Sequence, residues 1–147
     1  MSTSAFADSS ALVKLYAEEP GFEAVSDLGP IVIAQLSRVE VPSAIWKKYR
    51  RGEITQREAA VLEAYFEADF HGTAERGPRF LVMPTSTVVL EAATRIVRRH
   101  GLRAYDAVQL ASAVLAAEHN PELRCFAVFD KQLRSAAFAE GFTLIPD

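Results

Sequence analysis

Short apolar runs alternate along the chain with longer stretches in which apolar residues recur every three or four positions. Runs of that length are typical of buried strands, and the three-to-four spacing is typical of amphipathic helices. The predicted strands are residues 4–7, 31–34, 80–83, 124–129 and 142–145. The predicted helices are residues 9–16, 38–49, 55–70, 85–100 and 103–119.

Residues at the ends of these segments support the assignment. Thr55 and Glu58 have the spacing of a capping box, Gly101 follows a basic helix end, and the pair Asn120-Pro121 ends the next helix. Strands that alternate with helices, with few hairpin signals, predict an α/β fold with a mainly parallel sheet covered on both faces. In such sheets the ligand site lies beyond the carboxyl ends of the strands, near the switch in strand order.

Composition agrees with a globular protein. Of the 147 residues, 50% are apolar and 24% are charged, which excludes a disordered chain, collagen and a coiled coil, and no internal repeat or linker divides the chain. We therefore expect one domain over residues 1–147. The longest stretches without charge have 11 residues, well short of the roughly 20 that cross a membrane. The first residues lack a basic segment followed by an apolar core, so we expect a cytoplasmic protein that is not membrane-embedded.

Charge and cysteine content narrow the functions further. The net charge of −3 gives no overall attraction to nucleic acid, so a nucleic-acid function would depend on a local site, where bound metal ions reverse the sign of the charge. The single cysteine, Cys125, lies in an apolar run, and we expect a buried thiol without a chemical role.

Four acidic residues occupy the positions where a ligand site is expected. Asp8 and Asp130 each follow a predicted strand, and Glu40 and Asp106 lie near the starts of predicted helices. Each also has an ordinary structural explanation. Asp8 and Asp130 fit helix N-caps, and Glu40 fits the last position of a capping box that begins at Ser37. Asp106 instead heads the apolar face of its helix, in a stripe of residues with helical spacing: Gln109, Leu110, Ala113, Val114 and Ala117.

Taken together, the four residues point to a metal site. If the side chains converge, two carboxylates about 4 Å apart repel by roughly 4 kcal/mol at an effective dielectric constant near 20, so the cluster needs a cation or raised pKa values. Oxygen ligands without cysteine or histidine suit Mg²⁺ or Mn²⁺ better than zinc. His71, His100 and His119 show no metal-ligand spacing and are expected at the surface or at helix ends. Such metals commonly catalyse phosphodiester hydrolysis, so we predict a nuclease.

Four segments carry a resemblance to a known family. They are residues 8–16 (DSSALVKLY), 37–40 (SRVE), 102–111 (LRAYDAVQLA) and 129–133 (FDKQL). In order and spacing they resemble the motifs of PIN-domain ribonucleases of the VapC toxin type, and the resemblance covers essentially the whole chain. It implies a PIN-like three-layer α/β/α sandwich with a central sheet of about five strands.

The resemblance also implies an activity, partners and roles for particular residues. The activity is that of a Mg²⁺- or Mn²⁺-dependent endoribonuclease, a toxin that cleaves RNA, is inhibited by a VapB-like antitoxin and is typically a homodimer. By the resemblance, Asp8 and Asp106 are the principal metal ligands, and Glu40 and Asp130 complete the cluster directly or through water. Ser10 matches a small hydroxyl position that orients the cluster, although a capping role explains it equally well.

One residue departs from a regular helix, and two groups of residues have alternative explanations. Pro42 predicts that the helix carrying Glu40 either begins nearer Val41 or is kinked. The apolar residues of segment 55–70 either pack in the core or, in part, receive a partner helix. Basic residues near the acidic positions either bind RNA phosphates or stabilise helix ends; they are Arg95, Arg98, Arg99, Arg103, Lys47, Lys48, Arg50 and Arg51.

Other classes of protein fit less well. A PIN-fold binding module without catalysis is the main alternative, and the presence of all four acidic residues favours the enzyme. A phosphatase of the haloacid dehalogenase type requires a second aspartate where this chain has Ser10, and a receiver domain requires paired acidic residues after the first strand.

Overall fold

A five-stranded parallel sheet forms the centre of the computed structural model, which describes residues 3–147. The sheet order is β3-β2-β1-β4-β5, and every neighbouring pair is parallel. The bounds are β1 (Ala5–Ala7), β2 (Ile31–Ala34), β3 (Phe80–Met83), β4 (Cys125–Ala127) and β5 (Thr143–Ile145). All five predicted strands are therefore confirmed, three of them with shorter ends.

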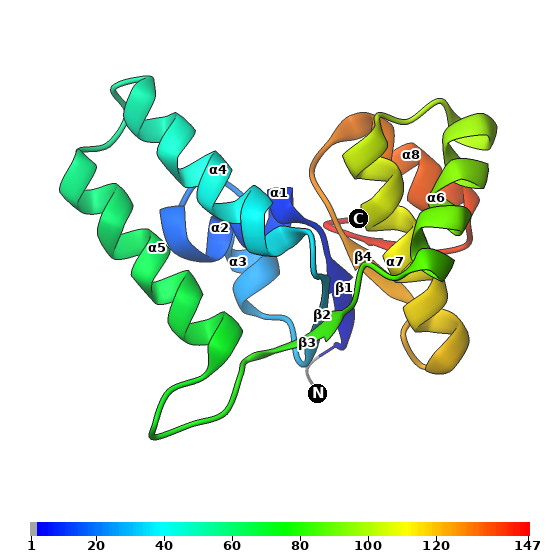
Figure 1. Ribbon diagram of the computed structural model, residues 1–147, viewed down its shortest axis with the longest axis horizontal. Coiled ribbons are helices and arrows are strands. Elements are labelled where there is room, and N and C mark those ends of the chain that lie inside the picture. The colour runs from blue at the N-terminus through cyan, green and yellow to red at the C-terminus, as the bar shows by residue number, and fades with distance from the viewer. Residues whose placement is uncertain (1–2) are drawn as a thin grey trace.

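Helices cover both faces of the sheet and make three layers (Figure 1). One layer contains α1 (Ser9–Leu12), α2 (Lys14–Ala17), α3 (Phe22–Ser26), α4 (Ser37–Arg50) and α5 (Gln56–His71). The other contains α6 (Thr87–His100), α7 (Ala104–His119) and α8 (Lys131–Ala139). This arrangement confirms the predicted α/β/α sandwich.

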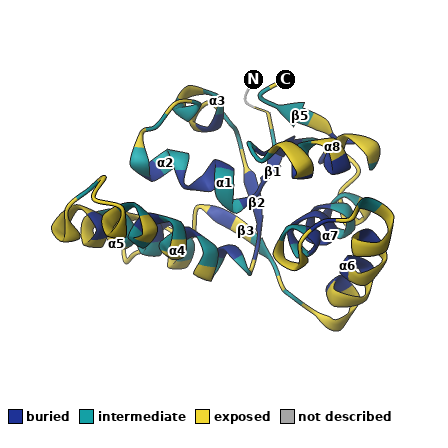
Figure 2. Cartoon of the chain, turned by 90° about the horizontal axis from the view of Figure 1, so that it is seen from above, coloured by how far each residue is buried: buried dark blue, intermediate teal, exposed yellow. Residues whose placement is uncertain are grey.

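The alternation of side chains along each strand explains why both faces are covered. On β2, Val32 packs with the core under α6, α7 and α8, whereas Ile31 and Ile33 pack with the core under α1 to α5. Figure 2 shows that the buried residues of the helices face the sheet and the exposed residues face outward. Strands that are apolar on both faces are the expected sequence pattern of a covered parallel sheet.

Helix boundaries agree with the capping residues, but the structure differs from the predicted helices in three places. The capping box of Thr55, the left-handed Gly101 (φ 67°) and the end of α7 at Asn120 are all confirmed. The helix predicted over residues 9–16 is instead divided at Val13 into α1 and α2. The five-residue helix α3 was not predicted because it is too short to show a helical period. The nine-residue helix α8 was also absent from the predicted helices, although Asp130 was expected as a helix N-cap.

The helix that carries Glu40 begins earlier than one prediction placed it. It begins at Ser37, so Pro42 lies inside it and the prediction of a start nearer Val41 is wrong. Proline lacks an N–H, and the bond it cannot make is the one to the carbonyl of Arg38. The preceding turn is tight, because Glu40 N–H bonds to the carbonyl of Leu36, which is also the acceptor for Val39.

The strand order places the switch point between β1 and β4. The chain runs from β1 outward through β2 and β3, and then returns to the other side of β1 with β4 and β5. Asp8 directly follows β1, and Asp130 lies three residues after β4. The carboxyl ends of these two central strands therefore position two of the four predicted site residues.

Two further sequence predictions concern Cys125 and the membrane. Cys125 is half-buried, so the expectation of a buried thiol is wrong. It lies at the first position of β4, in register with the exposed Thr143 of the edge strand, and is therefore less covered than Phe126 at the next position. Within residues 3–147, no helix is both long enough and apolar enough to cross a membrane.

Candidate functional site

Asp8 is a buried carboxylate at the end of β1. It is the N-cap of α1, where its Oδ1 accepts hydrogen bonds from Ala11 N–H (3.0 Å) and from Ser10 Oγ (2.7 Å). The residue is only 4% exposed, and this burial raises the pKa of Asp8 from 3.8 to about 7. The N-cap explanation is confirmed, but it leaves a charged group buried at the sheet edge with two neutral donors.

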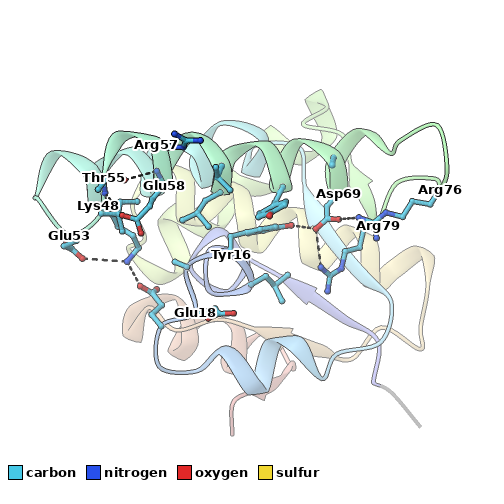
Figure 3. A pocket seen from close by; sticks show the side chains of 18 residues that line it. Tyr16, Glu18, Lys48, Glu53, Thr55, Arg57, Glu58, Asp69, Arg76 and Arg79 are labelled. Carbon is cyan, nitrogen blue, oxygen red and sulfur yellow. Dashed lines mark hydrogen bonds and ion pairs between the residues drawn. The ribbon is translucent and has the colours of Figure 1, made fainter.

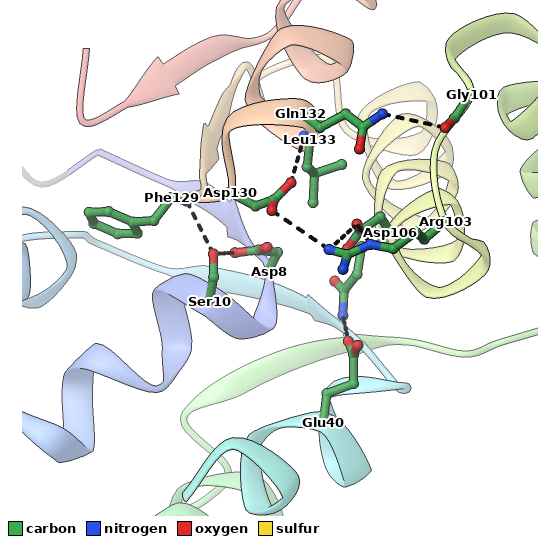
Figure 4. A network of polar contacts seen from close by, with 11 residues as sticks. Asp8, Ser10, Glu40, Gly101, Arg103, Asp106, Phe129, Asp130, Gln132 and Leu133 are labelled. Carbon is green, nitrogen blue, oxygen red and sulfur yellow. Dashed lines mark hydrogen bonds and ion pairs between the residues drawn. The ribbon is translucent and has the colours of Figure 1, made fainter. Parts of the chain in front are cut away.

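Ser10 connects Asp8 to the end of β4. Its hydroxyl donates to Asp8 and accepts a hydrogen bond from Phe129 N–H at 3.1 Å (Figure 4). Ser10 is therefore not the cap of α1. It orients the Asp8 carboxylate and ties it to the residue that precedes Asp130.

The side chain of Glu40 accepts hydrogen bonds from residues of other helices and not from the first turn of its own helix. Its Oε1 accepts hydrogen bonds from Ser9 Oγ at 2.8 Å and from Gln109 Nε2 at 2.7 Å. The capping box proposed for Ser37 and Glu40 does not form, because the helix begins one residue earlier, with Leu36 as its N-cap. Ser37 is fully buried, and its Oγ lies 3.0 Å from Ser9 Oγ and 3.1 Å from Gln109 Nε2.

Arg103 lies between Asp106 and Asp130. Its Nε and Nη2 donate to Asp106 Oδ2 at 3.2 and 3.0 Å, and Nη2 is 3.7 Å from Asp130 Oδ1 (Figure 4). Hydrogen bonding to Asp106, with its negative charge, raises the pKa of the guanidinium above its usual value. Asp130 is the N-cap of α8 and accepts Leu133 N–H at 2.9 Å, as the capping explanation predicted.

The four acidic side chains lie around one edge of the sheet, but donors separate them. Gln109 occupies an oxygen of Glu40, and Arg103 occupies an oxygen of Asp106. Across residues 3–147, no three Asp, Glu, His or Cys side chains lie close enough together to hold a metal ion. The roles of the four residues as metal ligands therefore remain predictions.

Sequence reasoning missed three polar residues of this edge. Ser9, Ser37 and Gln109 make a hydrogen-bonded group with Glu40, and Ser37 and Gln109 are almost completely buried. The signal for Gln109 was present, because it is a polar residue in the stripe that Asp106 heads. The serines gave no signal of their own, since hydroxyls at helix starts are ordinary caps.

The predicted basic residues fall into two groups. Arg103 lies beside the carboxylates, and Arg99 forms an ion pair with Glu140 at 2.7 Å. The basic residues at the end of α4 lie farther along that helix. Lys48 is eight residues after Glu40, a distance of about 12 Å along a helix axis, and it pairs with Glu19.

A second feature is a groove on the helical layer of α1 to α5. It has a volume of about 1040 Å³ and lies between α2, the α4–α5 turn, α5 and the segment after it (Figure 3). Two apolar residues of α5, Val61 and Tyr65, line it and are exposed, whereas Phe66 of the same helix is fully buried. Segment 55–70 therefore contributes both to the core and to an open surface. We call this feature the helical groove.

Comparison with known proteins identifies the family. Residues 5–139 match the model of the PIN domain, and the chain belongs to the PIN-domain family. Two relatives carry the names Ribonuclease VapC45 and Ribonuclease VapC49, both from Mycobacterium tuberculosis. Each is 34% identical over 143 residues, which is 95% of this chain and 92% of the relative. The chain is thus a VapC-type member of the family, as its motifs indicated.

Solved structures agree on the fold. The crystal structure of PAE2754 from Pyrobaculum aerophilum matches 98% of this chain and 85% of its own, with a TM-score of 0.63 and 22% identity. A toxin-antitoxin complex from Klebsiella pneumoniae matches 86% of both chains, with a TM-score of 0.53 and 16% identity. At these identities the likeness concerns the fold alone.

Proposed function

We propose that this protein is a divalent-metal-dependent endoribonuclease that hydrolyses RNA phosphodiester bonds and acts as the toxin of a toxin–antitoxin pair. The observation that carries the proposal is the placement of Asp8, Glu40, Asp106 and Asp130 around the switch point of the sheet. It occurs in a chain that is 34% identical to two ribonucleases over almost its whole length.

The oxygen ligands fit Mg²⁺, with Mn²⁺ as the alternative. Asp8 and Asp106 would be the principal ligands, and Glu40 and Asp130 would act directly or through water. The bound cation would activate a water molecule and neutralise charge that develops on the phosphate and the leaving oxygen. The buried Asp8 supports this fit, because burial raises its pKa and no basic side chain among residues 3–147 forms an ion pair with it.

The residues of the chain itself would prepare the site. Ser10 and Ala11 N–H hold the Asp8 carboxylate in one orientation. Among the arginines predicted to bind phosphate, Arg103 is the one beside the carboxylates, and its side chain is 75% exposed. It can therefore contact a phosphate of the RNA when a cation takes over the charge of Asp106.

The direct test is cleavage of labelled single-stranded and structured RNA by antitoxin-free protein with Mg²⁺, Mn²⁺ or EDTA. We expect metal-dependent cleavage that falls at least about 100-fold in Asp8→Asn and Asp106→Asn, because each variant removes charge that the cation and the transition state require. Asp27→Asn is the matched control, since Asp27 is an exposed carboxylate at the end of α3.

The opposite results are equally informative. If the folded wild-type protein binds neither ion and cuts no RNA, the protein is a PIN-fold binding module and not an enzyme. Full activity in both aspartate variants would show that the catalytic centre lies elsewhere than at this edge of the sheet.

We also propose that a helix of a VapB-like antitoxin binds in the helical groove. The support is the exposed apolar surface of α5, where Tyr65 is 61% exposed, beside charged residues of both signs at the rim of the groove. An amphipathic helix pairs its apolar stripe with such a surface and its polar residues with the rim.

Binding measurements with the cognate antitoxin test this surface. The double substitution Val61→Ala and Tyr65→Ala should weaken antitoxin binding at least about tenfold, the range expected for buried aromatic anchors. Phe138→Ala is the control, because Phe138 is also exposed but lies on α8. Unchanged affinity of the double variant would leave the groove without this role.

We also propose that the protein forms a homodimer, in which the partner is a second copy of this chain. The support is a second set of exposed apolar residues on α6, which includes Val88, Leu90 and Val97. Sedimentation equilibrium should give twice the chain mass for the wild type and a monomer for Leu90→Asp. A wild-type monomer at micromolar concentration would contradict the proposal.

A further inference from the structure

Gln109 is a buried polar residue next to Glu40. We call the edge of the sheet that carries Asp8, Glu40, Asp106 and Asp130 the acidic edge. Gln109 is 1% exposed and lies on α7, one turn after Asp106. Its Nε2 has three acceptors within reach, which are Glu40 Oε1 at 2.7 Å and the hydroxyls of Ser9 and Ser37, both at 3.1 Å. Its Oε1 is buried without a hydrogen-bond partner among residues 3–147.

The neighbours of Gln109 determine which way its amide points. A carboxylate oxygen only accepts hydrogen bonds, so the amide nitrogen must face Glu40, since the opposite orientation would bring two acceptors together. The same Glu40 oxygen also accepts from Ser9 Oγ at 2.8 Å. One oxygen of Glu40 is therefore held by two donors from two different helices.

Packing alone does not explain a glutamine at this position. The unpartnered Oε1 is unfavourable in a buried environment, and an apolar side chain of the same length would fill the space without that penalty. Compared with such an apolar side chain, glutamine adds an N–H donor that reaches Glu40 and the hydroxyls of Ser9 and Ser37. Pro42 makes such a donor valuable, because proline removes one hydrogen bond from the first turns of the helix that presents Glu40.

We propose that Gln109 is a positioning residue that holds one oxygen of Glu40 and so directs the other oxygen toward a cation at the acidic edge. This inference rests on the proposed function. Among the described residues, no donor lies within hydrogen-bond distance of Glu40 Oε2, so that oxygen remains available. Residues that orient a metal ligand in this way affect both metal affinity and activity.

The test compares wild type with Gln109→Met, which keeps length and volume but lacks the donor. We expect Mn²⁺ binding, measured by isothermal titration calorimetry, to weaken about tenfold, and kcat for RNA cleavage to fall about 10- to 100-fold. KM for RNA should change by less than about twofold, because Gln109 is buried and does not contact the substrate. The melting temperature without metal should change little, because the loss of the donor to Glu40, Ser9 and Ser37 is offset by the removal of the unpartnered oxygen.

Two further variants make the test specific. Gln109→His keeps an N–H donor at similar reach and should recover part of the Mn²⁺ affinity. Ser112→Ala removes another buried polar group of α7, whose hydroxyl donates to the carbonyl of Val108 in the same helix, and should leave all values unchanged.

Three results would overturn the inference. One is Mn²⁺ affinity and kcat of Gln109→Met within twofold of wild type. The second is a fall in melting temperature and in affinity together that Gln109→His does not reverse. If the wild type itself binds no Mn²⁺ and cuts no RNA, the proposed function fails. Crystal structures of the wild type and of Gln109→Met then test the role of Gln109 separately. An unmoved Glu40 side chain in Gln109→Met is the third overturning result, whereas a carboxylate turned away from its wild-type position supports the inference.

Discussion

Two aspartates of this protein are almost equally buried but are neutralised in different ways. Asp8 is 4% exposed and Asp69 is 6% exposed. Asp69, on α5, forms ion pairs with Arg76 at 2.7 Å and Arg79 at 3.3 Å and accepts the Tyr16 hydroxyl at 2.7 Å (Figure 3). Asp8 accepts hydrogen bonds from a serine hydroxyl and a backbone N–H, and no basic side chain among residues 3–147 forms an ion pair with it.

The difference separates a structural charge from one that is prepared for a ligand. A buried charge is tolerated only when it is paired or protonated. Asp69 is paired within the chain, and its cluster joins α2, α5 and the segment that leads to β3. Asp8 lacks a counter-charge of its own, so either a proton or an external cation must neutralise it. Burial alone does not distinguish the two sites, whereas the source of the positive charge does.

The largest effect is expected from breaking the paired site. Asp69→Ala should lower the free energy of unfolding by about 3 kcal/mol, the lower end of the range for buried ion pairs, because Arg76 and Arg79 are partly exposed. Urea denaturation measures this loss. Glu67, on the same helix as Asp69, pairs at the surface with Arg38 of α4 and contacts His71, and Glu67→Ala should cost less than about 1 kcal/mol. Equal losses of stability in the two variants would show that the buried ion pairs of Asp69 contribute no more than the surface pair of Glu67.

The unpaired site should make stability depend on pH in metal-free protein. The folded pKa of Asp8, about 7, lies above its unfolded value of 3.8, so the fold favours the protonated carboxyl. This contribution is fully present below pH 3.8 and is lost as the pH rises through 7. The rise corresponds to at most about 4 kcal/mol, and we expect about half of that because local relaxation and water reduce the effect.

Asp8→Asn isolates this contribution from those of other titrating groups. In EDTA, the wild type should lose about 2 kcal/mol relative to the variant between pH 4 and pH 8, measured by urea denaturation at each pH. The asparagine keeps an oxygen that accepts from Ser10 and Ala11. Adding Mg²⁺ at pH 8 should restore the loss in the wild type only. Parallel curves for the two proteins would show that Asp8 is not the source.

The sequence predicted the sheet well because its information is local and repeated. Each strand is a short apolar run, and the carboxyl ends of β1 and β4 follow from the alternation of strands and helices. Asp8 and Asp130 were therefore correctly placed at helix N-caps on that edge. The division at Val13 and the helix α3 were missed, because four- and five-residue helices are too short for a period to be read. The helix α8 was missed as well, and only its N-cap Asp130 was expected.

Long-range contacts were not accessible from the sequence. Gln109 meets Ser9 across 100 residues, and Ser37 meets both of them. The capping-box prediction for Glu40 failed for the same reason, since a local pattern was overruled by donors from α1 and α7. Patterns along the chain located the acidic residues. The hydrogen-bond donors and basic side chains that contact these residues depend on tertiary packing and could not be predicted.

The smallest effect is expected at Arg103, which is the exposed counterpart of Arg76 and Arg79. Its hydrogen bonds to Asp106 compete with a cation for the same carboxylate, but its side chain is 75% exposed, so water screens the pair and its contribution is small. Arg103→Ala should therefore tighten Mn²⁺ binding by no more than about fivefold in isothermal titration calorimetry. Arg99→Ala is the control, because it breaks a surface pair with Glu140 instead. Weaker Mn²⁺ binding in Arg103→Ala would mean that the guanidinium supports the acidic edge rather than competing for it.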